Sequence, residues 1–123
     1  MFKVTEFVEA VKTEGGASVS TIDGTSPTTG YIVSMGTDFS DVIPEAEFDT
    51  SSVSKFLWQY RWTLDKASHY LGAWRSDGLV YLDVVETFTD KMTAIRAGQK
   101  RNQIAIYDLT TGTEIATGGT GQK

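Results

Sequence analysis

Residues 69–88 read HYLGAWRSDGLVYLDVVETF, and this stretch decides the fold. At its centre, Asp77-Gly78 is a two-residue turn signal, because a type I′ turn needs positive φ at both central positions. Glycine adopts positive φ freely and aspartate tolerates it. Apolar and aromatic residues flank the turn on both sides, which is typical of paired strands. The sequence therefore predicts an antiparallel hairpin over residues 69–87 with its turn at 77–78.

The turn also fixes which residues face each other across the hairpin. Ser76 is expected opposite Leu79, and Trp74 opposite Tyr81. Side chains alternate between the two faces of a strand, so a shift of one residue would exchange the faces. The face expected to meet the core is aliphatic, with Leu71, Ala73, Val80, Leu82 and Val84. The second face is largely aromatic, with Tyr70, Gly72, Trp74, Tyr81, Asp83 and Val85.

Composition narrows the class of protein. The 123 residues are 40% hydrophobic and 11% aromatic, which suits one packed domain. The net charge of −5 argues against direct nucleic-acid binding, which usually needs a basic surface. The absence of cysteine removes disulfides and thiolate zinc sites. No apolar run approaches the roughly 18 residues of a membrane span, and the charged N-terminus does not resemble a signal peptide. We expect a cytoplasmic protein that does not associate with membranes.

Three further segments have the apolar periodicity of helices. They cover residues 5–13, 50–65 and 89–102, and the second carries the longest apolar stripe. Trp58 and Trp62 lie one helical turn apart beside that stripe. Either the buried face of this helix is wide, or the two tryptophans edge a groove.

Local signals mark the ends of these helices. Thr50, Ser51 or Ser52 can cap the second helix, and Thr89 can cap the third. Gly98 lies inside the third helix, where glycine costs about 1 kcal/mol relative to alanine. A glycine at this position predicts close packing against a neighbour or an early end of the helix.

The remaining segments complete an α+β fold. Residues 36–49 are expected to form an acidic surface loop, with Val42-Ile43 as a candidate short strand. The order α-β-β-α-β-β-α-β-β indicates a mainly antiparallel sheet of about six strands, with three helices on one face. The first two outer strands are expected to pair as a hairpin. Residues 1–117 form the single predicted domain, and residues 118–123 a flexible Gly-rich tail. The outer strands are predicted at 17–23, 28–35, 103–109 and 113–117.

The sequence offers little catalytic chemistry. His69 is the single histidine, and it should face Glu86 across the hairpin. A hydrogen-bonded pair on a sheet edge is favoured over a catalytic dyad, because no G-x-S-x-G nucleophile motif and no phosphate-binding loop accompany it. We expect no enzymatic activity, no cofactor and no metal site.

Two surfaces are candidate partner sites. The aromatic face of the hairpin is either covered by a helix or exposed, and its candidate partner-binding residues are Tyr70, Trp74, Tyr81 and Asp83. The acidic segment does not have the spacing of a calcium-binding loop, so a solvated loop is favoured. Its carboxylates could instead imitate the phosphates of a nucleic acid. The acidic-surface candidates are Asp38, Asp41, Glu45 and Glu47.

Two motifs resemble those of a known group of proteins. They are W-x-x-D-G-x-V-Y-L-D-V at 74–84 and N-Q-I-A-I-Y-D-L-x-T-G-x-E-I at 102–115, and the pieces at 15–18 and 27–34 fit the same group. The chain resembles small proteins of actinobacterial phages, plasmids and other mobile elements. The resemblance implies a mobile-element origin and no particular activity.

These observations predict a small acidic accessory protein of a phage or mobile element that acts by binding another protein. One alternative is an acidic inhibitor that imitates nucleic acid and blocks a host nuclease or another DNA-processing enzyme. A second alternative is a component of the virion. The expected location is the host cytoplasm, or the virion in the last case.

Overall fold

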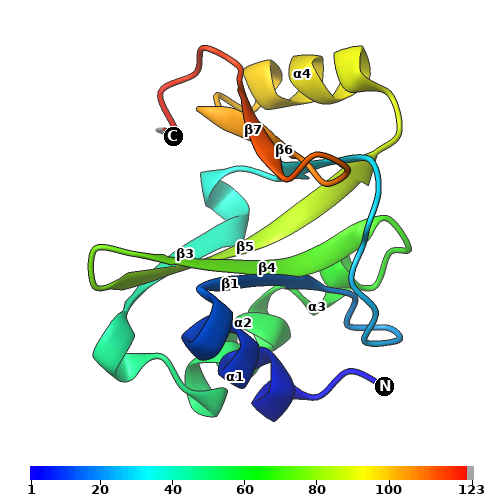
Figure 1. Cartoon of the computed structure of the whole chain (residues 1–123). Helices are drawn as coiled ribbons and strands as arrows, with labels where there is room; N and C mark the ends of the chain where they lie inside the picture. Colours follow the sequence, from blue (N-terminus) through cyan, green and yellow to red (C-terminus); the bar gives the residue numbers. More distant parts are fainter. Residues whose placement is uncertain (122–123) are drawn as a thin grey trace.

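The structure, a computed structural model, describes residues 1–121 and centres on one long hairpin (Figure 1). Strands β4 (His69–Ser76) and β5 (Leu79–Phe88) pair in the predicted register, with Ser76 opposite Leu79. Asp77 and Gly78 have φ values of 51° and 77°, as a type I′ turn requires. The prediction of the hairpin, its turn and its two faces is confirmed.

Shorter strands extend both sides of the hairpin into a seven-stranded antiparallel sheet. Strand β1 (Gly16–Val19) pairs with β4, whereas β2 (Tyr31–Ser34) and β3 (Ser40–Pro44) both pair with the other side of β5. Strand β6 (Ala105–Asp108) pairs with β2, and β7 (Thr113–Ala116) pairs with β6. The candidate strand around Val42 is thus real, and it raises the number of strands from about six to seven.

The predicted hairpin between the first two outer strands is wrong. Strands β1 and β2 lie on opposite sides of the β4–β5 hairpin, and residues 20–30 connect them around its open end. Strand β1 pairs with β4, and β2 pairs with β5, so each packs an apolar side chain beside a different part of the hairpin. Val19 packs against one core and Val33 against another, which a direct β1–β2 pairing would not allow.

The helices are α1 (Val4–Glu14), α2 (Thr50–Gln59), α3 (Arg61–Leu64) and α4 (Lys91–Lys100). Two 3-10 turns, η1 (Thr37–Phe39) and η2 (Glu45–Glu47), flank β3. The single helix predicted at 50–65 is divided at Tyr60 into α2 and α3.

The predicted caps are each displaced. Asp49 caps α2 in a reciprocal capping box with Ser52, and Asp90 caps α4 by accepting a hydrogen bond from the Thr93 N–H. An aspartate carboxylate is a stronger acceptor for the free N–H groups of the first turn than a neighbouring hydroxyl, and it also complements the helix dipole.

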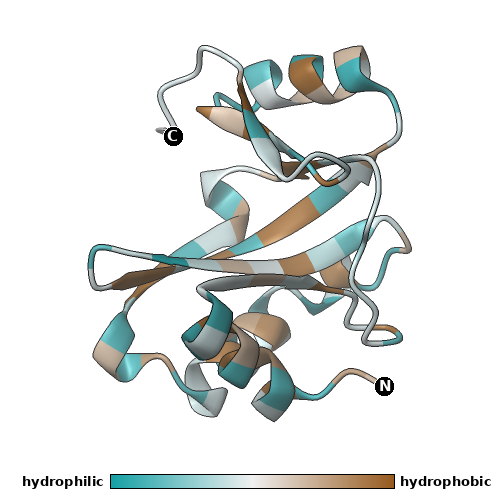
Figure 2. Cartoon of the chain, viewed as in Figure 1, coloured by the Kyte–Doolittle hydropathy of each residue, from teal (hydrophilic) through white to brown (hydrophobic). Residues whose placement is uncertain are grey.

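The helices form two groups that cover the same face of a bent sheet. Helices α1 and α2 lie beside β1 and β4, and α4 lies beside β6 and β7 at the opposite end of the molecule (Figure 1). In the first core, Leu71 and Leu82 pack against α1 and α2; in the second, Val33 packs against Ala94 of α4. Val33 pairs with Glu86, which shares a face of β5 with Leu82, so both cores lie on one face. Figure 2 shows that β5 carries both hydrophobic and hydrophilic residues.

Residues 118–121 return to the end of α4. The Thr120 N–H donates to Asn102 Oδ1 (3.0 Å), and the Gly121 N–H donates to the Asn102 carbonyl (2.8 Å). These bonds attach the first part of the tail that the sequence predicts to be flexible; residues 122–123 of that tail lie outside the described residues. Within residues 1–121, no helix is long and apolar enough to cross a membrane.

Candidate functional site: a groove on the open face of the sheet

The second face of the hairpin, which carries Trp74, Tyr81 and Asp83, is named here the open face. The buried residues of the described helices belong to cores on the other face, so none of these helices packs over it. Trp74 retains 49% of its exposed area. Of the two alternatives that the sequence left for this face, a covering helix is wrong for the described residues; Trp74 is exposed, whereas Val85 on the same face is buried.

A row of apolar side chains crosses the open face and is named here the aromatic ridge. It consists of Val42 on β3, Tyr81 on β5 and Trp74 on β4, which the strand register places side by side. The Trp74 and Tyr81 rings stack with centroids 4.2 Å apart and planes 11° apart. Val42 is half exposed, like Trp74. The ridge therefore offers apolar surface in a fixed geometry.

The next row along the sheet contains small and polar residues and is named here the polar lane. From β1 to β3 it runs through Ser18, Gly72, Asp83 and Ser40. A Cβ atom at Gly72 would lie 3.0 Å from Val85 Cγ1, which is closer than ordinary van der Waals contact. The Val85 side chain therefore packs closely against Gly72, and the residues paired with Asp83 on β4 and β3 are both small.

Ridge and lane line a groove of about 1090 Å³ on the open face. Because the sheet bends, Tyr107 on β6 and Ile104 just before β6 line the same groove, and they are 40% and 62% exposed. The view in Figure 1 places β6 and β7 across from β1 and β4. Four acidic residues belong to the lining, Glu14, Asp41, Asp83 and Glu114, and among the described residues it contains no lysine, arginine or histidine.

Asp83 is the titratable group at the floor of this groove. Burial raises the pKa of its carboxyl to about 6, and hydrogen bonds from Ser40 and Ser34 offset only part of this rise. Within residues 1–121, no basic side chain forms an ion pair with it. A carboxyl with this pKa is mostly ionised at pH 7. It can bind a cation, and at slightly acidic pH it can donate a hydrogen bond.

No protein-family model, curated protein or solved structure matches this chain. The function therefore has to be inferred from the groove and its chemistry.

The structure brings together three of the four partner-binding candidates. Trp74, Tyr81 and Asp83 line the groove, whereas Tyr70 shares their face outside the lining. The sequence did not identify Ser18, Ser40 and Val42, because β1 and β3 meet the hairpin only through long-range pairing. A signal was present for β3: Ser40 and Val42 alternate with Asp41 and Ile43, as expected for a strand with two different faces.

The acidic candidates lie on three different elements. Asp38 lies in η1, Asp41 in β3, and Glu45 and Glu47 in η2, and all four are exposed. Glu45 forms an ion pair with Arg75 at 3.2 Å, and only Asp41 reaches the groove. The acidic segment is thus distributed over three short elements around the sheet edge.

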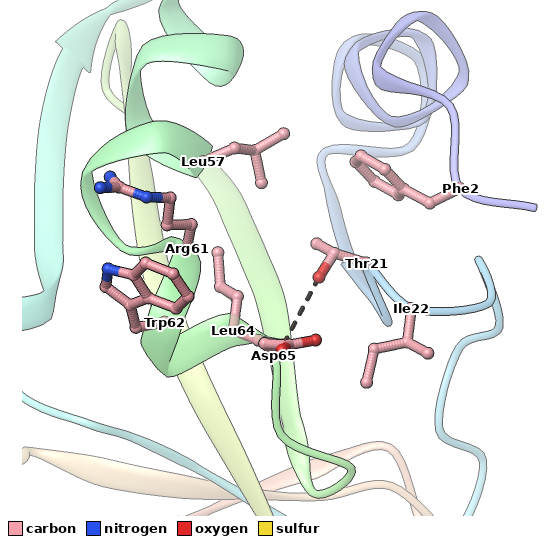
Figure 3. Close-up of a pocket in the computed structure, with 8 residues that line it drawn as sticks. All are labelled: Phe2, Thr21, Ile22, Leu57, Arg61, Trp62, Leu64 and Asp65. Carbon is pink, nitrogen blue, oxygen red and sulfur yellow. Dashed lines mark hydrogen bonds between the residues drawn. The ribbon is translucent and has the colours of Figure 1, made fainter.

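The other two tryptophans form a separate exposed cluster on α2 and α3. Trp58 and Trp62 are 69% and 74% exposed, so the wide buried face is wrong, and of the two only Trp62 lines a hollow. The Arg61 guanidinium lies 3.8 Å from the Trp58 ring centroid and 5.1 Å from that of Trp62. Beside them is a hollow of about 570 Å³, whose opposite wall includes Phe2 and Ile22 (Figure 3).

His69 lies on the other face of the hairpin, remote from the groove. Its ring is buried, Nδ1 donates to the Thr63 carbonyl (2.7 Å), and Nε2 lies 3.8 Å from Glu86 Oε2. Glu86 Oε1 in turn accepts from Arg101 Nη2 at 2.6 Å. The expected sheet-edge position is wrong, since β4 and β5 are inner strands. No group of three or more histidine and carboxylate side chains within residues 1–121 could hold a metal ion.

Proposed function

We propose that this chain is a non-catalytic accessory protein that binds a partner protein in the groove of its open face. The observation that carries this proposal is the exposure of the Trp74–Tyr81 stack beside the groove. Binding energy at protein interfaces concentrates in a few aromatic and arginine residues, and exposed apolar patches often mark interaction surfaces.

The dimensions of the groove favour a protein segment over a small molecule. Its volume of about 1090 Å³ exceeds the roughly 300–1,000 Å³ of small-molecule pockets. Its walls come from both ends of the sheet, so an extended segment can contact the ridge and β6 together. The rigid strand positions of the ridge and lane also reduce the entropy that binding would cost.

The resemblance of residues 74–84 and 102–115 to proteins of phages and plasmids supports a role in a mobile element. Such a protein would act on a component of the host or of the element itself. An acidic inhibitor that imitates nucleic acid and a virion component remain predictions from the sequence. The dispersal of the acidic residues and the Glu45–Arg75 pair give the first of these less support than the groove gives to partner binding.

The proposal can be tested by selecting peptides from a random display library against the immobilised chain. Affinities of the selected peptides are then measured by calorimetry. Trp74→Ala should weaken binding by at least about 2 kcal/mol, roughly 30-fold, because it removes the exposed anchor. Its free energy of unfolding should fall by far less than the roughly 3–5 kcal/mol lost when a core tryptophan is truncated.

Trp62→Ala is the matched control, since it removes a similarly exposed tryptophan outside the groove. It should leave the affinities of the selected peptides unchanged. Peptides that bind Trp74→Ala as tightly as the wild type, or a large loss of stability in that variant, would contradict the proposal.

A further inference from the structure

We propose that the groove binds its partner through one cationic side chain, an arginine, which pairs with Asp83 while its stem lies along the aromatic ridge. This inference rests on the proposed function and specifies the chemistry of the partner.

The negative charge of the groove favours the binding of a cation. Its lining includes four acidic residues but no lysine, arginine or histidine among the described residues. Elsewhere the chain pairs carboxylates with its own bases: the partly buried Glu86 binds Arg101, and the exposed Glu45 binds Arg75. Asp83 has hydrogen bonds from serine hydroxyls but no such ion pair within residues 1–121. Electrostatic complementarity of this kind selects partners of the opposite charge.

The residues paired with Asp83 across the sheet are small. Gly72 is directly opposite Asp83 on β4, and Ser40 is opposite it on β3, so neither neighbour carries a long side chain. The Ser34 and Ser40 hydroxyls stay near the carboxylate and can orient it. A planar guanidinium can reach such a carboxylate with two parallel hydrogen bonds.

The aromatic ridge explains why arginine fits better than lysine. Trp74 and Tyr81 occupy the row next to Asp83 on the same face, so a side chain that approaches the carboxylate from this row contacts their rings. Guanidinium groups stack on aromatic rings and are weakly hydrated, whereas an ammonium keeps its water more strongly. This chain already shows the pairing on its other aromatic cluster, where Arg61 lies over Trp58.

The test uses the full chain and a capped five-residue peptide with one central arginine between glycines and serines. The comparison peptide has citrulline, which keeps the shape of arginine but has no charge. Binding is followed by NMR at pH 7.5 through the Trp74 indole and the backbone amides of Ser18 and Gly72. The arginine peptide should shift these signals, and the citrulline peptide should bind at least about tenfold more weakly, because charge-assisted hydrogen bonds are roughly twice as strong as neutral ones.

Two variants and a pH series complete the test. Asp83→Asn should weaken the arginine peptide by at least about tenfold, since the neutral amide cannot pair with the cation. Glu9→Gln removes one negative charge from α1, outside the groove, and should change the affinity less than about twofold because exposed charges interact weakly. The affinity of the wild type should also fall as the pH drops below about 6, where Asp83 becomes protonated.

Three results would overturn the inference. Equal binding of the arginine and citrulline peptides, or no shift of the groove signals by either, would show that no cation is bound at Asp83. If the display-selected peptides still depend on Trp74 in that case, the proposed function stands and only the cationic partner is wrong. If the groove signals instead shift with protein concentration alone, a second copy of the chain occupies the groove.

Discussion

At the scale of single residues, the ionised Asp83 carboxylate lowers the stability of the fold but is able to bind a cation. Its pKa of about 6 means that the fold disfavours the ionised carboxylate relative to the unfolded chain, where the value is 3.8. A site that is retained despite such a cost is a candidate for function, because perturbed titratable groups gather at functional sites.

Asp83→Asn should therefore change how stability depends on pH. In the wild type, the folded chain holds the Asp83 proton more tightly than the unfolded chain does, so stability is lost as the pH rises from about 4 through 6. Asparagine does not titrate. The variant should exceed the wild type in unfolding free energy at pH 7.5, by at most about 3 kcal/mol, and this advantage should shrink toward pH 4. Urea unfolding at both pH values measures this difference in unfolding free energy between the variant and the wild type. A difference that does not change with pH would contradict the raised pKa of Asp83.

At the scale of elements, the two-residue turn controls the central hairpin. Gly78 has a φ of 77°, and its carbonyl accepts a hydrogen bond from the Glu45 N–H at 2.8 Å. The turn therefore sets the β4–β5 register and also the approach of η2.

Gly78→Val should destabilise the protein by roughly 1–3 kcal/mol, since a β-branched residue is strained at positive φ. Asp77→Asn, at the neighbouring turn position, should have little effect because asparagine also tolerates positive φ. Thermal melts of the two variants make the comparison. An unchanged melting temperature for Gly78→Val would contradict the prediction that stability depends on positive φ at this turn position.

Helix α4 depends on a glycine for its contact with the sheet. A Cβ atom at Gly98 would lie 2.9 Å from Ile106 Cγ2 and 3.0 Å from Thr117 Cγ2. Of the two explanations that the sequence offers for Gly98, close packing is confirmed, because the helix continues to Lys100.

Gly98→Ala should lower stability even though alanine favours helices. Overpacking of a core costs typically about 1–3 kcal/mol, which exceeds the gain of about 1 kcal/mol in helix propensity. Gln99→Ala, on the exposed side of the same turn, should be neutral or slightly stabilising. Urea unfolding of both variants would decide, and a more stable Gly98→Ala would show that α4 can move away from β6.

At the scale of the whole molecule, a polar chain links the two helical groups across the sheet. Thr63 at α3 binds His69 on β4, Glu86 on β5 lies beside His69, and Arg101 at the end of α4 binds Glu86. Arg101 Nη1 also donates to the Ser34 carbonyl at 3.3 Å. These contacts lie between the two apolar cores and fix their relative position.

Arg101→Ala should destabilise the protein by roughly 1–3 kcal/mol, because it leaves the partly buried Glu86 carboxylate without its strongest donor. The combination with Glu86→Gln should cost less than the sum of the single changes, since the two residues share one interaction. Arg96→Ala, an exposed arginine on the same helix, should change stability by less than about 0.5 kcal/mol. If the losses of unfolding free energy measured in urea were additive, Arg101 and Glu86 would not share one interaction.

The sequence by itself determined the central hairpin, its register, the contents of its two faces and the α+β class. These features follow from local rules: positive φ at a two-residue turn, alternation along strands and helical periodicity. Trp74, Tyr81 and Asp83 could be placed together because only two residues separate the strands that carry them.

Only the tertiary structure decided that the aromatic face stays open and that the exposed tryptophans of α2 and α3 lie elsewhere. It also placed β1 and β2 on opposite sides of the hairpin and brought β3 to β5, which completed the polar lane with Ser18 and Ser40. The pairing partner of a short strand depends on the long strand and the core that it contacts in the folded chain. These are long-range contacts, and no local sequence pattern specifies them. The bend of the sheet, which brings β6 to the same groove as the hairpin, likewise appears only in the tertiary structure.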